Sequence, residues 1–138
     1  MKIQQISIFL ENAAGRLAEV TKVLKDGGVN LRAIMIADTA DFGILRIIVD
    51  SVPRAIEILE RAQFTTKTTD VLAVTVPDSV GSLAGVLQLF EKNSINIEYL
   101  YAALEKAGET AIIIFKVEDV EKGLAVVDAN GLSTTKDF

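Results

Sequence analysis

A short polar loop near the start of the sequence has the residues and the spacing needed to bind a small anion. It spans residues 11–17 and holds a glycine, Gly15, where an apolar strand pattern gives way to a helix pattern. A helix N-terminus exposes unpaired N–H groups and carries the positive end of the helix dipole, and a glycine there lets an anion approach the backbone. The loop therefore favours binding of a carboxylate. The alternative is that the glycine serves only the turn.

The same arrangement returns sixty-six residues later, with Gly81 in the place of Gly15, Leu83 in that of Leu17, and Asn96 in that of Asn30. An internal repeat sets the unit of folding. We therefore expect two related domains, residues 1–70 and 71–138. A unit of about seventy residues is near the lower limit for burying a core of its own, so the two are expected to pack together.

Two pairs of polar residues accompany the repeated glycines. Asn12 and Asp78 occupy the same place in the two loops, and Asn30 and Asn96 stand at the start of the next strand. All four side chains can accept a hydrogen bond from an ammonium group, and the two strand-start Asn side chains can also donate to a carboxylate. An amino-acid ligand needs both kinds of hydrogen bond, because it carries an ammonium and a carboxylate group. The alternative is that Asn12 and Asp78 cap helices and that the other two complete turns.

Hydrophobic periodicity predicts the elements that must position these residues. The first half is expected to have strands at 3–10, 31–37, 44–49 and 64–69, with helices around 17–24 and 53–62. The second half is expected to have strands at 72–76, 96–103, 110–117 and 132–135, a hairpin at 105–109, and helices at 82–91 and 121–127. Asn12, Ser51 and Asp119 are the expected caps of three of the helices.

Each half thus has the order βαββαβ, which folds through short right-handed connections as a ferredoxin-like sheet. The expected class is α+β: two domains side by side, each a four-stranded antiparallel sheet with both helices on one face. In this topology the loop after the first strand and the hairpin between the second and third strands lie at the same end of the sheet. No Gly-, Pro- or Ser-rich linker separates the halves, which restricts their relative orientation.

The composition excludes most familiar active sites, because the chain has no His and no Cys. It cannot form a Ser-His-Asp triad, a thiolate nucleophile or a typical zinc site. We therefore expect no enzyme, no cofactor and no metal. The net charge of −5 argues against nucleic acid and anionic membrane surfaces as partners. The absence of a long apolar run and of a signal segment predicts a cytoplasmic protein.

Both halves resemble ACT domains, the small βαββαβ modules that bind amino acids and regulate amino-acid metabolism. The family's loop reads as an acidic or amide residue, a variable residue, Pro-Gly, one more residue and Leu. The sequence has Asn12-Ala13-Ala14-Gly15-Arg16-Leu17 and Asp78-Ser79-Val80-Gly81-Ser82-Leu83, followed by Asn30-Leu31 and Asn96-Ile97. The proline is replaced by Ala14 and Val80. The tandem order and the run of residues 36–46 resemble stand-alone double-ACT proteins of bacteria.

The resemblance implies a ligand between domains, held by the glycine loop of one and the second-strand Asn of the other. The first loop would then meet Asn96, and the second loop would meet Asn30. We favour the first loop, because Asp38, Asp41 and Phe42 lie on the hairpin at its end of the sheet. The two acids can bind a ligand ammonium, or they are turn residues on a solvated hairpin.

Other polar and aromatic residues have competing roles. Arg16, Arg32 and Arg46 can each bind a carboxylate, although Arg32 and Arg46 lie on neighbouring strands and are expected to pair with nearby acids. Tyr99 and Tyr101 share one face of a strand and line either a pocket, a core or a subunit contact.

The resemblance and the repeated loop together predict a non-catalytic amino-acid sensor. The alternative is a regulatory subunit of an amino-acid biosynthetic enzyme, similar to the small subunit of acetolactate synthase. Because sheet edges invite pairing, a homodimer is expected, and an enzyme of amino-acid metabolism is the expected larger partner.

Overall fold

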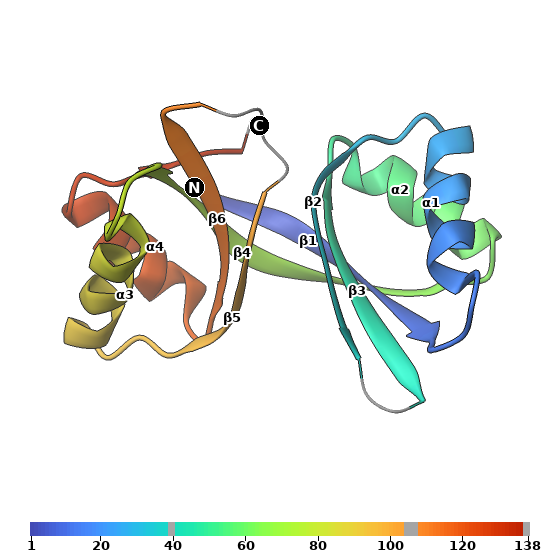
Figure 1. Cartoon of the computed structure of the whole chain (residues 1–138), viewed down its shortest axis with the longest axis horizontal. Coiled ribbons are helices and arrows are strands. Elements are labelled where there is room, and N and C mark those ends of the chain that lie inside the picture. Colours follow the sequence, from blue (N-terminus) through green and yellow to red (C-terminus); the bar gives the residue numbers. More distant parts are fainter. Residues whose placement is uncertain (39–40, 104–107, 137–138) are drawn as a thin grey trace. The chain divides into compact units, whose positions relative to one another are not determined.

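The structure is a computed structural model of the 138-residue chain, and it describes residues 1–38, 41–103 and 108–136. The elements in these residues are β1 (Lys2–Glu11), α1 (Arg16–Asp26), β2 (Leu31–Asp38), β3 (Phe42–Val49), α2 (Val52–Arg61), β4 (Thr65–Pro77), α3 (Ser82–Lys92), β5 (Ile97–Ala102), β6 (Thr110–Val117), α4 (Val120–Ala129) and β7 (Ser133–Thr134) (Figure 1). Contacts divide the chain into two compact units. The N-terminal unit is Gln4–Thr69, and the C-terminal unit combines Met1–Ile3 with Asp70–Phe138.

In the N-terminal unit the strands follow the order β2-β3-β1-β4, and β3 is antiparallel to both of its neighbours. Helices α1 and α2 cover one face of this sheet (Figure 1). The core between the sheet and the helices holds alternate residues of β1 and β3, such as Ile8 and Leu45, which do not contact solvent because they pack against Leu24 and Leu59. This is the ferredoxin-like arrangement that the periodicity predicts.

The C-terminal unit repeats the arrangement, with the order β5-β6-β4 and with β7 on the other side of β4. Helices α3 and α4 cover one face (Figure 1). Phe90 of α3 and Phe115 of β6 are fully buried in its core, where their rings meet edge to face with centroids 5.3 Å apart. The chain is therefore an α+β protein in which βαββαβ occurs twice.

The main difference from the expected elements concerns β4. The strands expected at 64–69 and 72–76 are one continuous strand, β4, whose first residues belong to the N-terminal unit and whose last belong to the C-terminal unit. A run of β-branched residues continues through this segment without a breaker, so nothing ends the strand. The hairpin expected at 105–109 lies largely outside the described residues.

The helix caps provide a first test of the local structure. The Asp119 side chain accepts a hydrogen bond of 3.0 Å from the Lys122 N–H, as expected of a cap, whereas Ser51 is the N-cap of α2 without a side-chain bond. Asp119→Ala is expected to lower the free energy of unfolding by about 1 kcal/mol, and Ser51→Ala by clearly less. Urea denaturation of both variants checks this, and equal losses would contradict the difference between the caps.

An ion cluster in the C-terminal unit predicts a dependence of stability on pH. The Lys2 Nζ lies 2.7 Å from Glu121 Oε1 and 3.2 Å from Asp70 Oδ2. Hydrogen bonds to Glu121 and then to Asp70 raise the pKa of Lys2 above its ordinary value. A raised pKa in the folded state stabilises the fold below the unfolded-state pKa of about 10.4 and ceases to do so as the pH rises through the folded-state pKa.

Wild-type protein should therefore lose more stability above about pH 10 than Lys2→Met does, which urea denaturation across alkaline pH measures. Lys67→Met changes an exposed lysine of β4 outside this cluster and serves as the control. Parallel pH profiles for wild type and Lys2→Met would show that the cluster contributes nothing.

Candidate functional site

The first glycine loop connects β1 to α1 through a tight, hydrogen-bonded turn. Gly15 is the N-cap of α1 with φ of 86°, and no side chain caps this helix. The expectation that Asn12 caps it is wrong, because the left-handed residue, and not the polar one, directly precedes the helix. The Asn12 N–H instead donates to the Asp41 carbonyl over 3.0 Å, and the Ala13 N–H donates to the Glu11 carbonyl over 2.9 Å.

The second loop has the same geometry. Gly81 is the N-cap of α3 with φ of 89°, again without a side-chain cap, so Asp78 does not cap its helix either. The Asp78 N–H donates to the Glu109 carbonyl over 2.8 Å, and the Ser79 N–H donates to the Pro77 carbonyl over 2.9 Å. Ser79 and Ser82 also join their hydroxyl groups over 2.9 Å. The sequence repeat is therefore a repeat of backbone geometry at the loop.

The two glycines are explained in part by the backbone. A positive φ disfavours residues with a Cβ, so the turn by itself requires glycine. The space that a Cβ would enter at Gly15 and at Gly81 holds no atom within 4 Å. Packing thus leaves the side of each loop open beside the helix N-terminus, where N–H groups lack intrahelical partners. This open N-terminus can receive a carboxylate.

The two strand-start Asn residues lie at the opposite helix ends from the glycines. Asn30 follows the end of α1 and exchanges bonds with Asp50: its N–H donates to Asp50 Oδ1 over 3.1 Å, and the Asp50 N–H donates to its carbonyl over 3.2 Å. Asn96 has the equivalent place after α3 and accepts from the Glu118 N–H over 3.0 Å. Helices of eleven residues are about 16 Å long, so neither unit brings its own glycine and Asn together.

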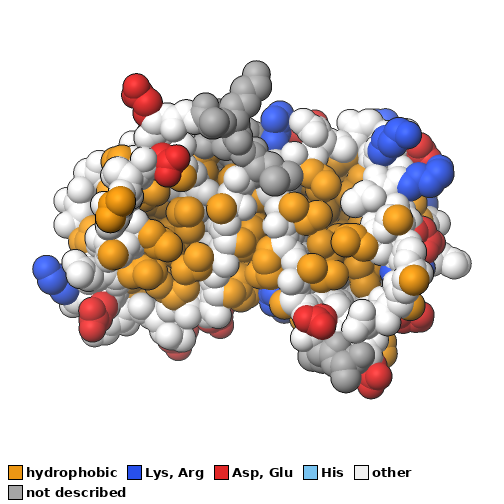
Figure 2. Space-filling view, in the orientation of Figure 1, with side chains coloured by type: hydrophobic (Ala, Val, Ile, Leu, Met, Phe, Trp, Pro, Cys, Tyr) orange, Lys and Arg blue, Asp and Glu red, His pale blue; other side chains and the backbone are white. Residues whose placement is uncertain are grey.

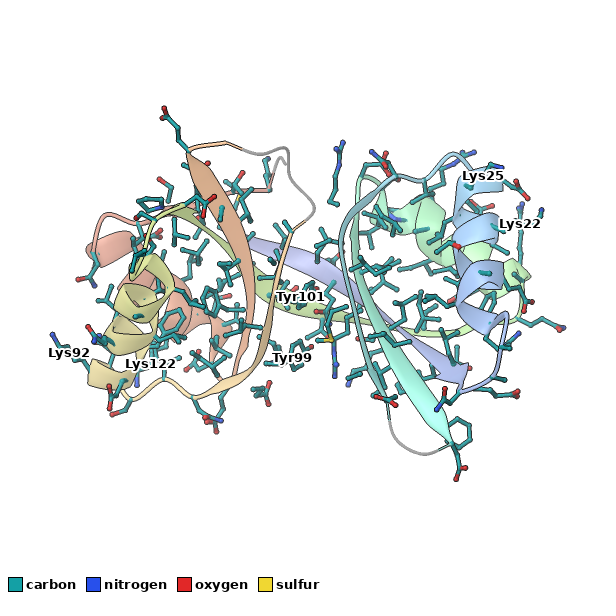
Figure 3. The ribbon with its side chains drawn as sticks, viewed as in Figure 1. Lys22, Lys25, Lys92, Tyr99, Tyr101 and Lys122 are labelled. Atoms are coloured by element: carbon teal, nitrogen blue, oxygen red, sulfur yellow. The ribbon has the colours of Figure 1, made fainter. Side chains whose placement is uncertain are left out.

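A cavity of about 370 Å³ opens beside Asn30 in the N-terminal unit. Its lining residues are Thr21, Leu24, Lys25, Gly28, Val29, Asn30 and Leu31. Only Asn30 and Leu31 of these are predicted site residues; Thr21 and Lys25 are among the other five, although their spacing from the predicted helix end places them over Asn30. Figure 3 shows Lys25 at that end of α1. The cavity combines the Lys25 ammonium and the Asn30 amide, which can hold a carboxylate, whereas the Thr21 hydroxyl donates to the Leu17 and Ala18 carbonyls.

A second cavity, of about 260 Å³, lies in the N-terminal unit close to the first glycine loop. It is lined by Phe9, Leu10, Glu11, Arg16, Phe42, Gln63, Phe64 and Thr65. Arg16 and Phe42 were expected in a site, whereas Phe9, Gln63 and Phe64 were not. The sequence predicts Phe64 at the start of a strand, and no signal in it indicates that the ring meets the start of α1.

The hairpin between β2 and β3 lies at the same end of the sheet as the first loop, as expected. Glu11 pairs with Phe42, and Asp38 pairs with Gly43 across the strands. The bond between Asn12 and Asp41 joins the loop directly to this hairpin. Residues 39–40, between Asp38 and Asp41, lie outside the described residues.

The remaining candidates take structural positions. Arg46 lies on β3, paired with Ser7 on one side and Met35 on the other. Tyr99 and Tyr101 project from one face of β5, as expected from their spacing, and Tyr101 is buried (Figure 3). Neither tyrosine lines the two cavities described above.

The surface shows no single dominant charge on the face in view. Acidic, basic and hydrophobic side chains all occur on the part of each unit that is in view and not drawn in grey (Figure 2). Among the described residues, no helix combines the length and the apolar character that crossing a membrane requires.

The repeated βαββαβ fold and the repeated glycine loops define the class of the protein. The chain belongs to the ACT domain family, since it matches the ACT domain pair over residues 1–137. It is similar to protein BT0572 from Bacteroides thetaiotaomicron, with 36% identity, 98% of this chain and 92% of that chain covered, and a TM-score of 0.92.

Its fold is also similar to the ligand-free regulatory subunit of aspartate kinase from Thermus thermophilus. That match has 18% identity, 94% of each chain covered, and a TM-score of 0.65. The corresponding subunit from Thermus flavus gives 19% identity, the same coverage and a TM-score of 0.64. No curated protein matches the chain.

Proposed function

We propose that the protein is a non-catalytic amino-acid sensor in which the glycine loops bind the ligand. The observation that carries the proposal is the repeated loop, with an uncapped helix N-terminus, a left-handed glycine and open space beside it in both copies. Membership of the ACT family supports this proposal, because amino-acid binding is common among ACT domains. Binding that favours one arrangement of domains over another would then carry the signal.

The ligand would bridge two half-sites from different ACT domains, in one chain or in two copies. One half-site is a glycine loop, which receives the carboxylate at the helix N-terminus. The other is the strand-start Asn, with the cavity that contains Asn30 and Lys25. The separation of Gly15 from Asn30 along α1 supports this division, because the glycine loop and the strand-start Asn of one unit lie too far apart to bind one small ligand.

A second candidate is a regulatory subunit of an amino-acid biosynthetic enzyme. The observation behind this candidate is the fold that the chain shares with the regulatory subunits of aspartate kinase. In this case the protein acts in the cytoplasm, and its partner is an enzyme. The edge strands β2 and β5 are available for pairing in a homodimer.

A thermal-shift screen against the standard amino acids at millimolar concentration tests the sensor. A ligand that binds only the folded state raises the apparent stability by mass action, by about 2.7 kcal/mol at a hundred times its Kd. One or a few hits among the amino acids are expected. A uniform lack of effect would reject the sensor, and affinity purification with mass spectrometry would then test for an enzyme partner.

A further inference from the structure

We propose that the ligand is an amino acid with an apolar side chain, and that its half-site at the first glycine loop is the cavity between Arg16 and the three phenylalanines of the N-terminal unit. This inference rests on the proposed function and names its ligand class. The cavity of about 260 Å³ is smaller than a typical ligand pocket of roughly 300–1,000 Å³, so its occupant must be small.

Arg16 provides a fixed cation for the carboxylate. Its Nη1 donates to Glu19 Oε2 over 2.7 Å, and its guanidinium carbon lies 5.1 Å from the centre of the Phe64 ring. Its Nε is buried and has no hydrogen-bond partner in the part of the chain that the structure describes. A guanidinium group has five N–H donors in a planar fork, so a second carboxylate can bind beside Glu19.

Glu11 provides the group for the ligand ammonium. It lies at the end of β1, opposite Phe42, and it lines the same cavity as Arg16. Within residues 1–38, 41–103 and 108–136 its carboxylate takes part in no ion pair. A carboxylate and a guanidinium facing one small cavity match the two charged groups of an amino acid.

Four of the six other lining residues are apolar, three of them phenylalanines, and the remaining two, Gln63 and Thr65, are polar. Phe64 is buried, whereas Phe9 and Phe42 are 45% and 60% exposed, which is unusual for large aromatic side chains. Covering such apolar surface contributes about 25 cal/mol per Å², so a ligand with an apolar side chain gains affinity here and a charged one does not. The chemistry therefore selects phenylalanine-like or leucine-like amino acids.

The repeat shows that the scaffold does not need these residues. Pro77 pairs with Thr110 as Glu11 pairs with Phe42, and Ser82 takes the place of Arg16. Thr75 takes the place of Phe9. Leu132 takes the place of Phe64, because the Leu132 N–H donates to the Val127 carbonyl as the Phe64 N–H donates to the Leu59 carbonyl. The equivalent wall has no charge and no aromatic ring, so the first cavity is specialised beyond the common fold.

Isothermal titration with L-phenylalanine, L-leucine, L-lysine and L-glutamate tests the inference. Wild type should bind the first two more tightly than the last two, and 3-phenylpropanoate, which lacks the ammonium, should bind at least about tenfold more weakly than L-phenylalanine. Arg16→Gln should lower the affinity for L-phenylalanine by about ten- to hundredfold, because a charge-assisted hydrogen bond is lost. Phe42→Ala, at an exposed position, should weaken it without affecting the fold.

Arg61→Gln is the matched control, since Arg61 is an exposed arginine paired with Glu57 on α2. It should leave the affinity unchanged, and thermal melts should show that Arg16→Gln still folds. If amino acids bind but Arg16→Gln matches wild type, or if L-lysine and L-glutamate bind best, this inference fails and the sensor stands. If wild type binds none of the standard amino acids, the sensor itself fails.

Discussion

Phe90→Ala is expected to lower the free energy of unfolding by about 3–5 kcal/mol. The Phe90 ring is completely buried on α3, and it meets the Phe115 ring of β6 at an interplanar angle of 87°. Truncation removes the transfer energy of the ring, leaves a cavity in a core filled mainly by aliphatic side chains, and abolishes an edge-to-face contact that contributes about 0.5–1.5 kcal/mol. Urea denaturation monitored by circular dichroism measures the loss.

Phe42→Ala is the control for this experiment, because it removes the same side chain from a position that is 60% exposed. Its effect should stay within about 0.5 kcal/mol, as for most surface substitutions. A loss below about 1 kcal/mol in Phe90→Ala would mean that the core of the C-terminal unit refills the space, and that the ring pair does not hold α3 on the sheet.

Gly15→Val should reduce amino-acid affinity by about tenfold or more and cost about 1–3 kcal/mol of stability. The backbone at Gly15 is left-handed, and a β-branched side chain is strained there. The new side chain also enters the open space beside the helix N-terminus, where the ligand carboxylate is expected. Thermal melts measure the stability, and titration with the amino acid identified by the screen measures the affinity.

Two further variants separate strain from obstruction. Gly15→Asn keeps a residue that tolerates the left-handed conformation, so it should retain near wild-type stability while still losing affinity. Gly81→Val makes the same change in the second loop. Unchanged affinity in Gly15→Asn would remove the first loop from the binding site, and a loss confined to Gly81→Val would assign the ligand to the second loop.

The fold could be predicted from the sequence because the repeat and the hydrophobic periods agree. Residues such as Leu24 and Phe90 recur on one face of each predicted helix, and both are buried in the structure. The βαββαβ order then leaves few topologies, since connections are short and right-handed. The confirmed elements include β6, whose bounds match the prediction of 110–117.

Details that depend on tertiary contacts could not be predicted. A polar residue before a helix suggests a cap, but the backbone at Gly15 places Asn12 outside the helix start. Likewise, Arg16 and Phe64 are distant in sequence, and only the turn that follows α2 brings the ring beneath the guanidinium. Local patterns contain no information about such a contact. The glycine loops remain the predicted site, while the Phe64 wall of the cavity was accessible only from the fold.

The ion cluster around Lys2 has a consequence for how the chain folds as it is made. Lys2 is synthesised well before its partner Glu121, which follows 119 residues later. At a synthesis rate of about 5–20 residues per second, the two are separated by roughly 6–24 s on the ribosome. Residues 4–69 are complete long before that time, so the N-terminal unit can fold first. The C-terminal unit is completed later, because its Asp70–Phe138 part follows the N-terminal unit in the chain, whereas its Met1–Ile3 segment precedes that unit.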